Sequence, residues 1–143
     1  MDSMAIAKML GTTCITGRVI AETDAVMFDI DETLIHVDGT PIIEMISLLN
    51  KCRNMGYNVI IITARPDHAV NHVYTRVQLI SFGIYPHAVY FVPPHEKTKV
   101  KQQTGLRYIL SVGDLVSDLG GSDYWIKLPD ETDKNVYSNI VIH

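Results

Sequence analysis

Short apolar runs alternate with longer amphipathic stretches along most of this chain. Apolar runs of four to six residues are typical of strands buried on both faces of a parallel sheet. The expected strands are residues 25–30, 59–62, 89–92, 108–112 and 124–128. Helical spacing of apolar residues predicts helices from Pro41 to Gly56 and over about 67–82, and a short polar helix over 95–104. This alternation predicts an α/β fold with a central parallel sheet of about five strands.

The two longer helices differ in what their patterns predict. In the first, Pro41 suits the opening turn, and apolar residues recur at helical spacing, at Ile42, Met45, Ile46, Leu49 and Cys52. We interpret it as a packing helix. In the second, one face carries Ala69, Val70, Val73, Val77 and Ile80.

Two segments carry weaker signals. Residues 1–24 allow a short helix from Ala5 to Leu10 that ends at Gly11, then a strand or hairpin arm from Cys14 to Ile20. Residues 34–41 contain Asp-Gly between short apolar pieces, which favours a tight turn. We expect the latter to form a small flap hairpin just after the first strand.

Polar residues follow three of the expected strands where each one ends. They are Asp29 and Asp31, then Thr63 and Arg65, then Asp114 and Asp118. The carboxyl ends of parallel strands meet at one edge of a sheet, so these side chains should converge there.

Asp29 and Asp31 carry like charges close together, which a divalent cation would neutralise. With Asp114 and Asp118 they form an oxygen-rich set that suits Mg²⁺, and no His or Cys in the set favours zinc. Thr63 adds a hydroxyl, and Lys97, Lys99 and Lys101 add ammonium groups, as phosphoryl transfer requires. The competing interpretation is a strand followed by a turn in which the aspartates only cap backbone donors.

The composition narrows the class of protein. The length of 143 residues is that of one ordinary domain, spanning 1–143 with a core of about 25–128, and 47% hydrophobic residues suffice for a core. A formal net charge of −4 argues against a strong nucleic-acid-binding surface but does not exclude a nucleotide substrate. Cys14 and Cys52 lack metal-ligand spacing and indicate a reducing compartment. Without an evident signal peptide or membrane segment, we expect a cytoplasmic protein that does not bind membranes.

The order of these motifs resembles that of the haloacid dehalogenase superfamily of phosphohydrolases. The resemblance runs from about residue 25 to 128 and rests on Asp29-Ile-Asp31-Glu-Thr33, Thr63-Ala-Arg65, a lysine, and Gly113-Asp114 with Asp118. Residues 113–120 and 126–129 are similar to the class III acid phosphatase branch. The family's fold is a three-layer Rossmann-like sandwich. The short spacings between motifs predict a form without a cap domain.

The resemblance implies a role for each motif residue. Asp29 would be the nucleophile, forming an aspartyl-phosphate, and Asp31 the general acid and base. Mg²⁺ would be held by Asp29, the Asp31 carbonyl and Asp114, with Asp118 nearby. Thr63 and the backbone N–H of Ala64 would hold the phosphoryl oxygens, and the implied binding residues also include Thr33.

Some assignments stay open at the level of sequence. Lys99 is the first choice for the motif lysine, and Lys97 the second, whereas Lys101 is expected to be a solvated helix charge. Arg65 either lies near the substrate or forms a surface ion pair. His36 and His68 either contact the substrate or are simply exposed.

The predicted function is Mg²⁺-dependent hydrolysis of phosphomonoesters. An uncapped site would admit phosphate groups on nucleotides, nucleic-acid ends or phosphoproteins, and an oligomer could cover it. The alternatives are a catalytically silent phosphate-binding or regulatory module of the same fold, and a phosphotransferase that passes the phosphoryl group to an alcohol.

Overall fold

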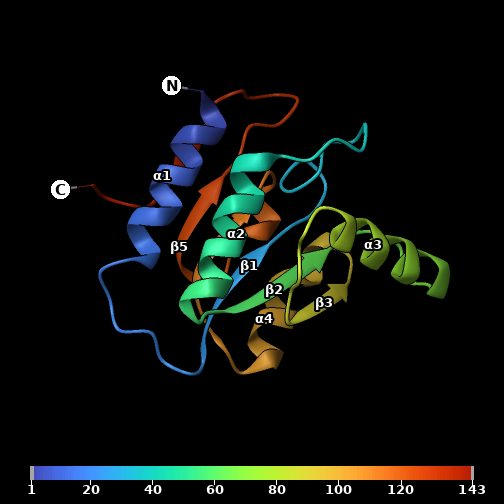
Figure 1. Ribbon diagram of the computed structural model, residues 1–143, viewed down its shortest axis with the longest axis horizontal. Coiled ribbons are helices and arrows are strands. Elements are labelled where there is room, and N and C mark those ends of the chain that lie inside the picture. The colour runs from blue at the N-terminus through green and yellow to red at the C-terminus, as the bar shows by residue number, and fades with distance from the viewer. Residues whose placement is uncertain (1, 143) are drawn as a thin grey trace.

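A computed structural model describes residues 2–142 and shows a central sheet between helices (Figure 1). The elements in chain order are α1 (Ser3–Ile15), β1 (Asp24–Phe28), α2 (Ile43–Met55), β2 (Asn58–Thr63), α3 (Ala69–Ser81), β3 (Ala88–Phe91), the 3₁₀ turn η1 (Pro94–Glu96), α4 (Lys97–Thr104), β4 (Arg107–Gly113), the 3₁₀ turn η2 (Val116–Asp118), β5 (Ser122–Lys127) and β6 (Tyr137–Ser138). The predicted α/β fold is confirmed.

The sheet has the order β3-β2-β1-β4-β5-β6, which places β1 near its centre. The first five strands in this order are mutually parallel, as expected, and β6 pairs antiparallel with β5. The sequence did not predict β6, because a two-residue strand carries no pattern of its own. All five parallel strands end at the same edge, and the loops after β1, β2 and β4 meet there.

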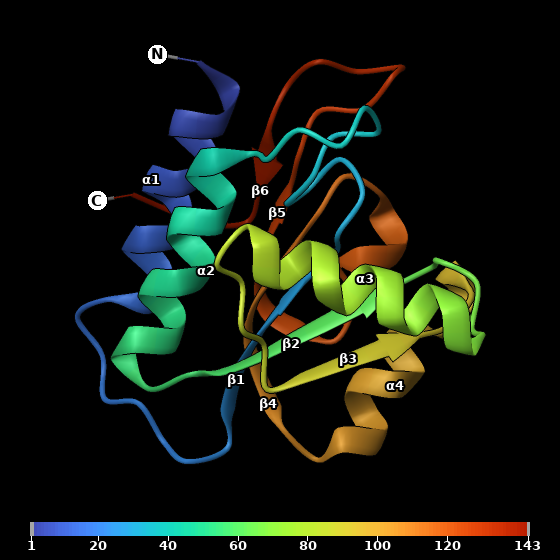
Figure 2. The ribbon, with the colours of Figure 1, turned by 45° about the vertical axis from the view of Figure 1, so that its right-hand side comes forward.

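Side chains that alternate along β1 divide the core into two layers. Val26 and Phe28 pack among residues of α1, α2 and α3, whereas Ala25 and Met27 pack against Val100 of α4. Figures 1 and 2 show α1, α2 and α3 over one face of the sheet and α4 behind the other. This arrangement confirms the three-layer, Rossmann-like sandwich.

The N-terminal segment differs from its prediction. Helix α1 does not end at Gly11 but continues to Ile15, and no strand forms between residues 14 and 20. A Cβ at position 11 would collide with the side chain of Leu48 in α2. Gly11 therefore permits close packing of two helices rather than ending one. Cys14 lies on the same buried face, with Cys52 of α2; both thiols are free.

Helix α2 buries its apolar stripe as expected, but it begins later than predicted. Pro41 forms a bridge with Ile35 in the flap, and the helix starts at Ile43. Gly56, in the left-handed region at φ 107°, ends the helix as expected.

Helix α3 lies close to the predicted range, but its apolar face points outward. Val70, Val73, Val77 and Ile80 are each more than half exposed, and the buried residues of α3 are Thr75 and Leu79. The polar face is turned inward because Thr75 and Gln78 accept hydrogen bonds from the Arg65 guanidinium.

The connections between strands are short. Within the described residues, the flap and α2 fill the connection from β1 to β2, and α3 fills that from β2 to β3. None of the helices in this part of the chain combines the length and the apolar character that crossing a bilayer requires.

Candidate active site

Three carboxylates meet where β1 and β4 end. The backbone N–H of Asp29 donates to the carbonyl of Val112 in β4 at 3.1 Å, which brings the two strand ends together. One oxygen each from Asp29, Asp114 and Asp118 lies within 4.8 Å of the other two. Asp29 and Asp118 are buried, and Asp114 is half-buried. The predicted convergence of the first and fourth strand ends is therefore correct.

Lys97, the first residue of α4, is the cation that faces this cluster. Its ammonium donates to Asp29 Oδ1 at 3.0 Å and to Asp118 Oδ1 at 2.6 Å, and the residue is 2% exposed. Burial acts to lower the pKa of Lys97, but the two carboxylates outweigh burial and raise it. Lys97 is therefore charged and holds two buried carboxylates in place.

The remaining negative charge in the cluster is unfavourable in the absence of a further cation. Burial, followed by repulsion from Asp118, raises the pKa of Asp29 to about 7 despite the opposing effect of Lys97. The same two causes raise the pKa of Asp114 to about 6. Carboxylates with raised pKa values gain most from a bound cation, which stabilises their ionised form.

Gly113 and the turn after it position Asp118. A Cβ at residue 113 would overlap the Asp118 carboxylate, so glycine alone fits there. The N–H of Leu115 donates to Asp118 Oδ2 at 3.2 Å. Both observations show that the loop after β4 is built around this buried side chain.

The two threonines predicted to hold phosphoryl oxygens are both buried. Thr63 ends β2, and its Oγ1 accepts the N–H of Arg65 at 3.1 Å, which leaves the hydroxyl hydrogen free to be donated. Thr33 is fully buried, and its Oγ1 has no hydrogen-bond partner among the described residues. A buried hydroxyl without a partner is one that a bound group or water would satisfy.

Asp31 points toward Arg65 rather than into the carboxylate cluster. Arg65 Nε and Nη2 donate to the two oxygens of Asp31 at 3.1 and 2.8 Å. Arg65 Nη1 donates to Thr75 Oγ1 at 3.0 Å and to Gln78 Oε1 at 2.8 Å, both on α3. Most of the guanidinium donors are thus used within the protein, and Arg65 fixes the orientation of Asp31.

The flap after Asp31 is stabilised by its own backbone. Glu32 has a positive φ of 59°, which turns the chain sharply, and its Oε1 accepts the N–H of Val37 at 2.7 Å. Bridges join Ile35 to Asp31 and to Pro41, so the predicted flap exists, with its tip at Asp38 and Gly39.

Comparison with known families decides the classification. Residues 26–103, more than half of the chain, match the haloacid dehalogenase-like hydrolases. The chain belongs to this family. No curated protein sequence matches it.

The matched range contains part of the candidate site. The matched residues of this haloacid dehalogenase-like hydrolase include Asp29, Asp31, Thr63 and Lys97. Asp114 and Asp118 lie beyond the matched range, and it is the geometry of the cluster that adds them to the site.

A divalent cation fits the donor set of this hydrolase. The three clustered side chains offer only carboxylate oxygens, and neither histidine nor cysteine belongs to the cluster. Hard cations such as Mg²⁺ prefer such ligands. Their charge would also stabilise the ionised forms of Asp29 and Asp114, whose pKa values are raised.

The lysines of α4 differ from their predictions. Lys99, the first choice, is exposed, and it is Lys97 that reaches the carboxylates. Residues 97 and 99 are two apart, and a helix turns about 200° over that interval, so they point in opposite directions.

Lys101 was expected to be solvated but is 1% exposed. Its ammonium donates to Ser111 Oγ at 2.9 Å and to the carbonyls of Asp118 and Gly120, both at 2.6 Å. Burial lowers the pKa of Lys101 to about 8. Lys101 lies one helical turn after Lys97. Lys97 binds the side chain of Asp118, and Lys101 binds the backbone of the same loop. The spacing of four residues places both lysines on one helix face, and this was the available sign in the sequence that Lys101 is buried too.

Proposed function

We propose that this chain is a Mg²⁺-dependent phosphomonoesterase that works through an aspartyl-phosphate on Asp29. The observation that carries the proposal is the contact of Lys97 with Asp29 within a cluster of three carboxylates. A carboxylate at a strand end, faced by an ammonium group and by cation ligands, has the surroundings that a nucleophile for phosphoryl transfer needs.

The chain's own residues divide the first step between them. An oxygen of Asp29 attacks phosphorus, and the bond from phosphorus to the ester oxygen breaks. Thr63 donates its hydroxyl hydrogen to a phosphoryl oxygen, together with the N–H of Ala64. Lys97 keeps Asp29 oriented and offsets negative charge. Bound Mg²⁺, held by Asp29, Asp114, Asp118 and the Asp31 carbonyl, would supply further positive charge against the phosphate.

Asp31 serves the leaving group and then the water. In its protonated form Asp31 gives its proton to the departing oxygen and becomes a carboxylate. In the second step this carboxylate takes a proton from the water that attacks the phosphoryl group, which releases Asp29 and inorganic phosphate and restores the protonated form. Because Arg65 binds both oxygens of Asp31, the carboxylate has to release part of this contact before it can act.

The test is hydrolysis of p-nitrophenyl phosphate by the purified chain. We expect turnover that EDTA abolishes and added Mg²⁺ restores, and Asp29→Asn should lower kcat by at least about 10³-fold. The thermal unfolding midpoint should not fall, because Lys97 keeps Asp118 as its partner and the substitution removes an unfavourable buried charge. Asp67→Asn is the matched control, because Asp67 is an exposed aspartate that pairs with His72 outside the cluster. A fully active Asp29→Asn protein would exclude the mechanism.

Two further measurements separate the alternatives. Acid quenching with ³²P-labelled substrate should leave label on the protein, and hydroxylamine should remove it, as for an acyl phosphate. Transfer of label to an added alcohol instead of water would identify a phosphotransferase. Mg²⁺-dependent phosphate binding without any turnover would identify a silent binding module. Two free, buried thiols support the reducing, cytoplasmic location that we also propose.

A further inference from the structure

A cavity of about 590 Å³ lies beside the carboxylate cluster, between the flap and the turn after β5. Glu32, His36 and Val37 of the flap line one side, and residues 129–132 with Lys134 line the other. Asp114 belongs both to the wall of this cavity and to the carboxylate cluster, so the cavity adjoins the site. Its volume is within the range of pockets that bind small organic groups.

We infer that this cavity receives the leaving group of the substrate and selects phosphopeptides with lysine or arginine beside the phosphorylated residue. The inference rests on the proposed phosphomonoesterase function. A phosphoryl group placed at Asp29 has its ester oxygen directed away from the attacking carboxylate, and a cavity that shares Asp114 with the site is where the attached group can lie.

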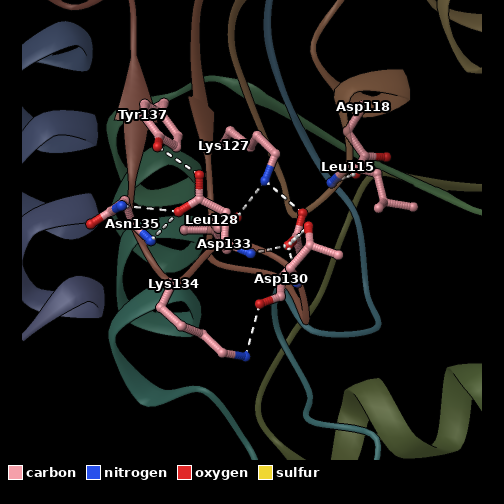
Figure 3. Close-up of polar contacts among 10 residues, drawn as sticks. Leu115, Asp118, Lys127, Leu128, Asp130, Asp133, Lys134, Asn135 and Tyr137 are labelled. Carbon is pink, nitrogen blue, oxygen red and sulfur yellow. Dashed lines mark hydrogen bonds and ion pairs between the residues drawn. The ribbon is translucent and has the colours of Figure 1, made fainter.

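The turn that forms one wall is rigid because Asp130 organises it. Its carboxylate accepts the Lys127 ammonium at 2.9 Å and the N–H groups of Thr132 and Asp133 at 2.7 and 2.8 Å. The Lys134 ammonium donates to the Asp130 carbonyl at 2.8 Å (Figure 3). A wall fixed in this way can discriminate between ligands without first having to be ordered.

The charges of the lining select the ligand. The lining contains the carboxylates of Glu32, Asp114, Asp130 and Glu131 and, from lysine or arginine, the ammonium of Lys134 alone. Lys127 neutralises Asp130, and a bound cation would neutralise Asp114. Glu32 is held within the flap, where its Oε1 accepts the Val37 N–H and its Oε2 lies 3.4 Å from His36 Nδ1. Glu131 is therefore the lining carboxylate that is left to face the ligand. Further phosphates on a nucleotide or an oligonucleotide would meet like charge here, whereas lysine or arginine would meet opposite charge.

Apolar side chains complete the wall. Met4, Val37, Leu115 and Pro129 also line the cavity, and Val37 is 85% exposed while Leu115 is 46% exposed. The methylene stems of lysine or arginine can cover such apolar surface while their charged ends reach carboxylates. This combination suits a basic peptide better than a small hydrophilic phosphate ester.

The experiment compares two phosphopeptides of equal length, with the phosphorylated residue flanked by lysines in one and by glutamates in the other. We expect kcat/KM for the basic peptide to be at least about tenfold higher at low ionic strength, and the ratio to shrink as salt is added. Glu131→Lys should bring the ratio close to one. Glu22→Lys, the same charge change at an exposed residue just before β1 and at the opposite end of the strands, should leave the ratio and the hydrolysis of p-nitrophenyl phosphate unchanged.

Each outcome bears on one proposal. Equal kcat/KM values for the two peptides, or the same ratio in the Glu131→Lys and Glu22→Lys proteins, would overturn this inference. So would faster hydrolysis of a nucleoside monophosphate or a 3′-phosphorylated oligonucleotide than of the basic peptide. Failure to hydrolyse p-nitrophenyl phosphate as well would instead overturn the proposed phosphomonoesterase function.

Discussion

The two faces of helix α4 place the same residue type in opposite surroundings. On the inner face, Lys97 and Lys101 are almost fully buried. Lys97 donates hydrogen bonds to carboxylates of the site, and Lys101 donates to the loop that supports them. On the outer face, Lys99 is exposed. The difference shows that a lysine can be buried where acceptors surround its ammonium group, because a buried charge without partners is too unfavourable to retain.

The largest expected effect follows from removing Lys97. Lys97→Met leaves the buried carboxylates of Asp29 and Asp118 without their cation. Because deleting one partner of a buried ion pair leaves an uncompensated charge, the unfolding free energy should fall by about 3–5 kcal/mol. We expect kcat for p-nitrophenyl phosphate to fall by at least about 10²-fold. Thermal unfolding and steady-state kinetics on the same preparation check both effects. Wild-type turnover in this variant would show that the inner face is not part of the site.

A smaller effect is expected at Lys101, which contacts the loop rather than the nucleophile. Lys101→Met leaves the carbonyls of Asp118 and Gly120 without their buried donor, and the unfolding free energy should fall by about 1–3 kcal/mol. The Mg²⁺ concentration for half-maximal activity should rise more than kcat falls, because the carboxylate of Asp118 loses its support. Denaturant unfolding and Mg²⁺ titration measure these quantities. A fall in kcat equal to that of Lys97→Met would contradict the distinction.

The charges that face Lys97 predict a graded dependence of stability on pH. Burial and Asp118 raise the pKa of Asp29 to about 7, and that of Asp114 to about 6, from an ordinary 3.8. Between pH about 4 and 7, the folded protein therefore binds more protons than the unfolded chain. The unfolding free energy without metal should fall as pH rises through this range. Added Mg²⁺ should reduce the fall, because it binds the ionised carboxylates. Urea unfolding at several pH values tests this, and a rise over the same range would contradict it.

The smallest effect belongs to the outer face. Lys99→Ala removes an exposed side chain, so the unfolding free energy should stay within about 0.5 kcal/mol of wild type. We expect kcat and KM for p-nitrophenyl phosphate to change less than about twofold. This variant is the matched control for the other two lysines. A large loss of activity would restore Lys99 as the motif lysine.

The fold was predictable where pattern and burial agree. The run of apolar residues in β1 and the stripe on α2 led to the correct strand and helix because both are buried as their patterns suggest. On α3, helical spacing predicted the helix but could not show the direction of its apolar face. That direction depends on Arg65, which lies outside the helix and binds Thr75 and Gln78.

The site shows the same division between local and tertiary information. The positions of Asp29, Thr63 and Asp114 followed from strand ends, since parallel strands bring their carboxyl ends together. The choice of lysine did not follow from the sequence. Helix α4 begins at Lys97, two residues after the predicted start at residue 95, and the separate turn η1 precedes it. Which lysine faces the carboxylates depends on how this helix packs on the sheet, and no local pattern shows that packing. The partnership of Arg65 with Asp31 joins residues 34 positions apart, and no local pattern signals it.

The two free thiols of helices α1 and α2 allow transient opening of that layer to be measured by the rate of thiol alkylation. Burial raises the pKa of Cys14 to about 12 and that of Cys52 further still, so neither forms a reactive thiolate in the closed structure. Alkylation can then proceed only during moments when the layer separates. The rate at which a maleimide or iodoacetamide modifies the native protein thus counts those openings and gives the free energy of a motion that no static structure contains.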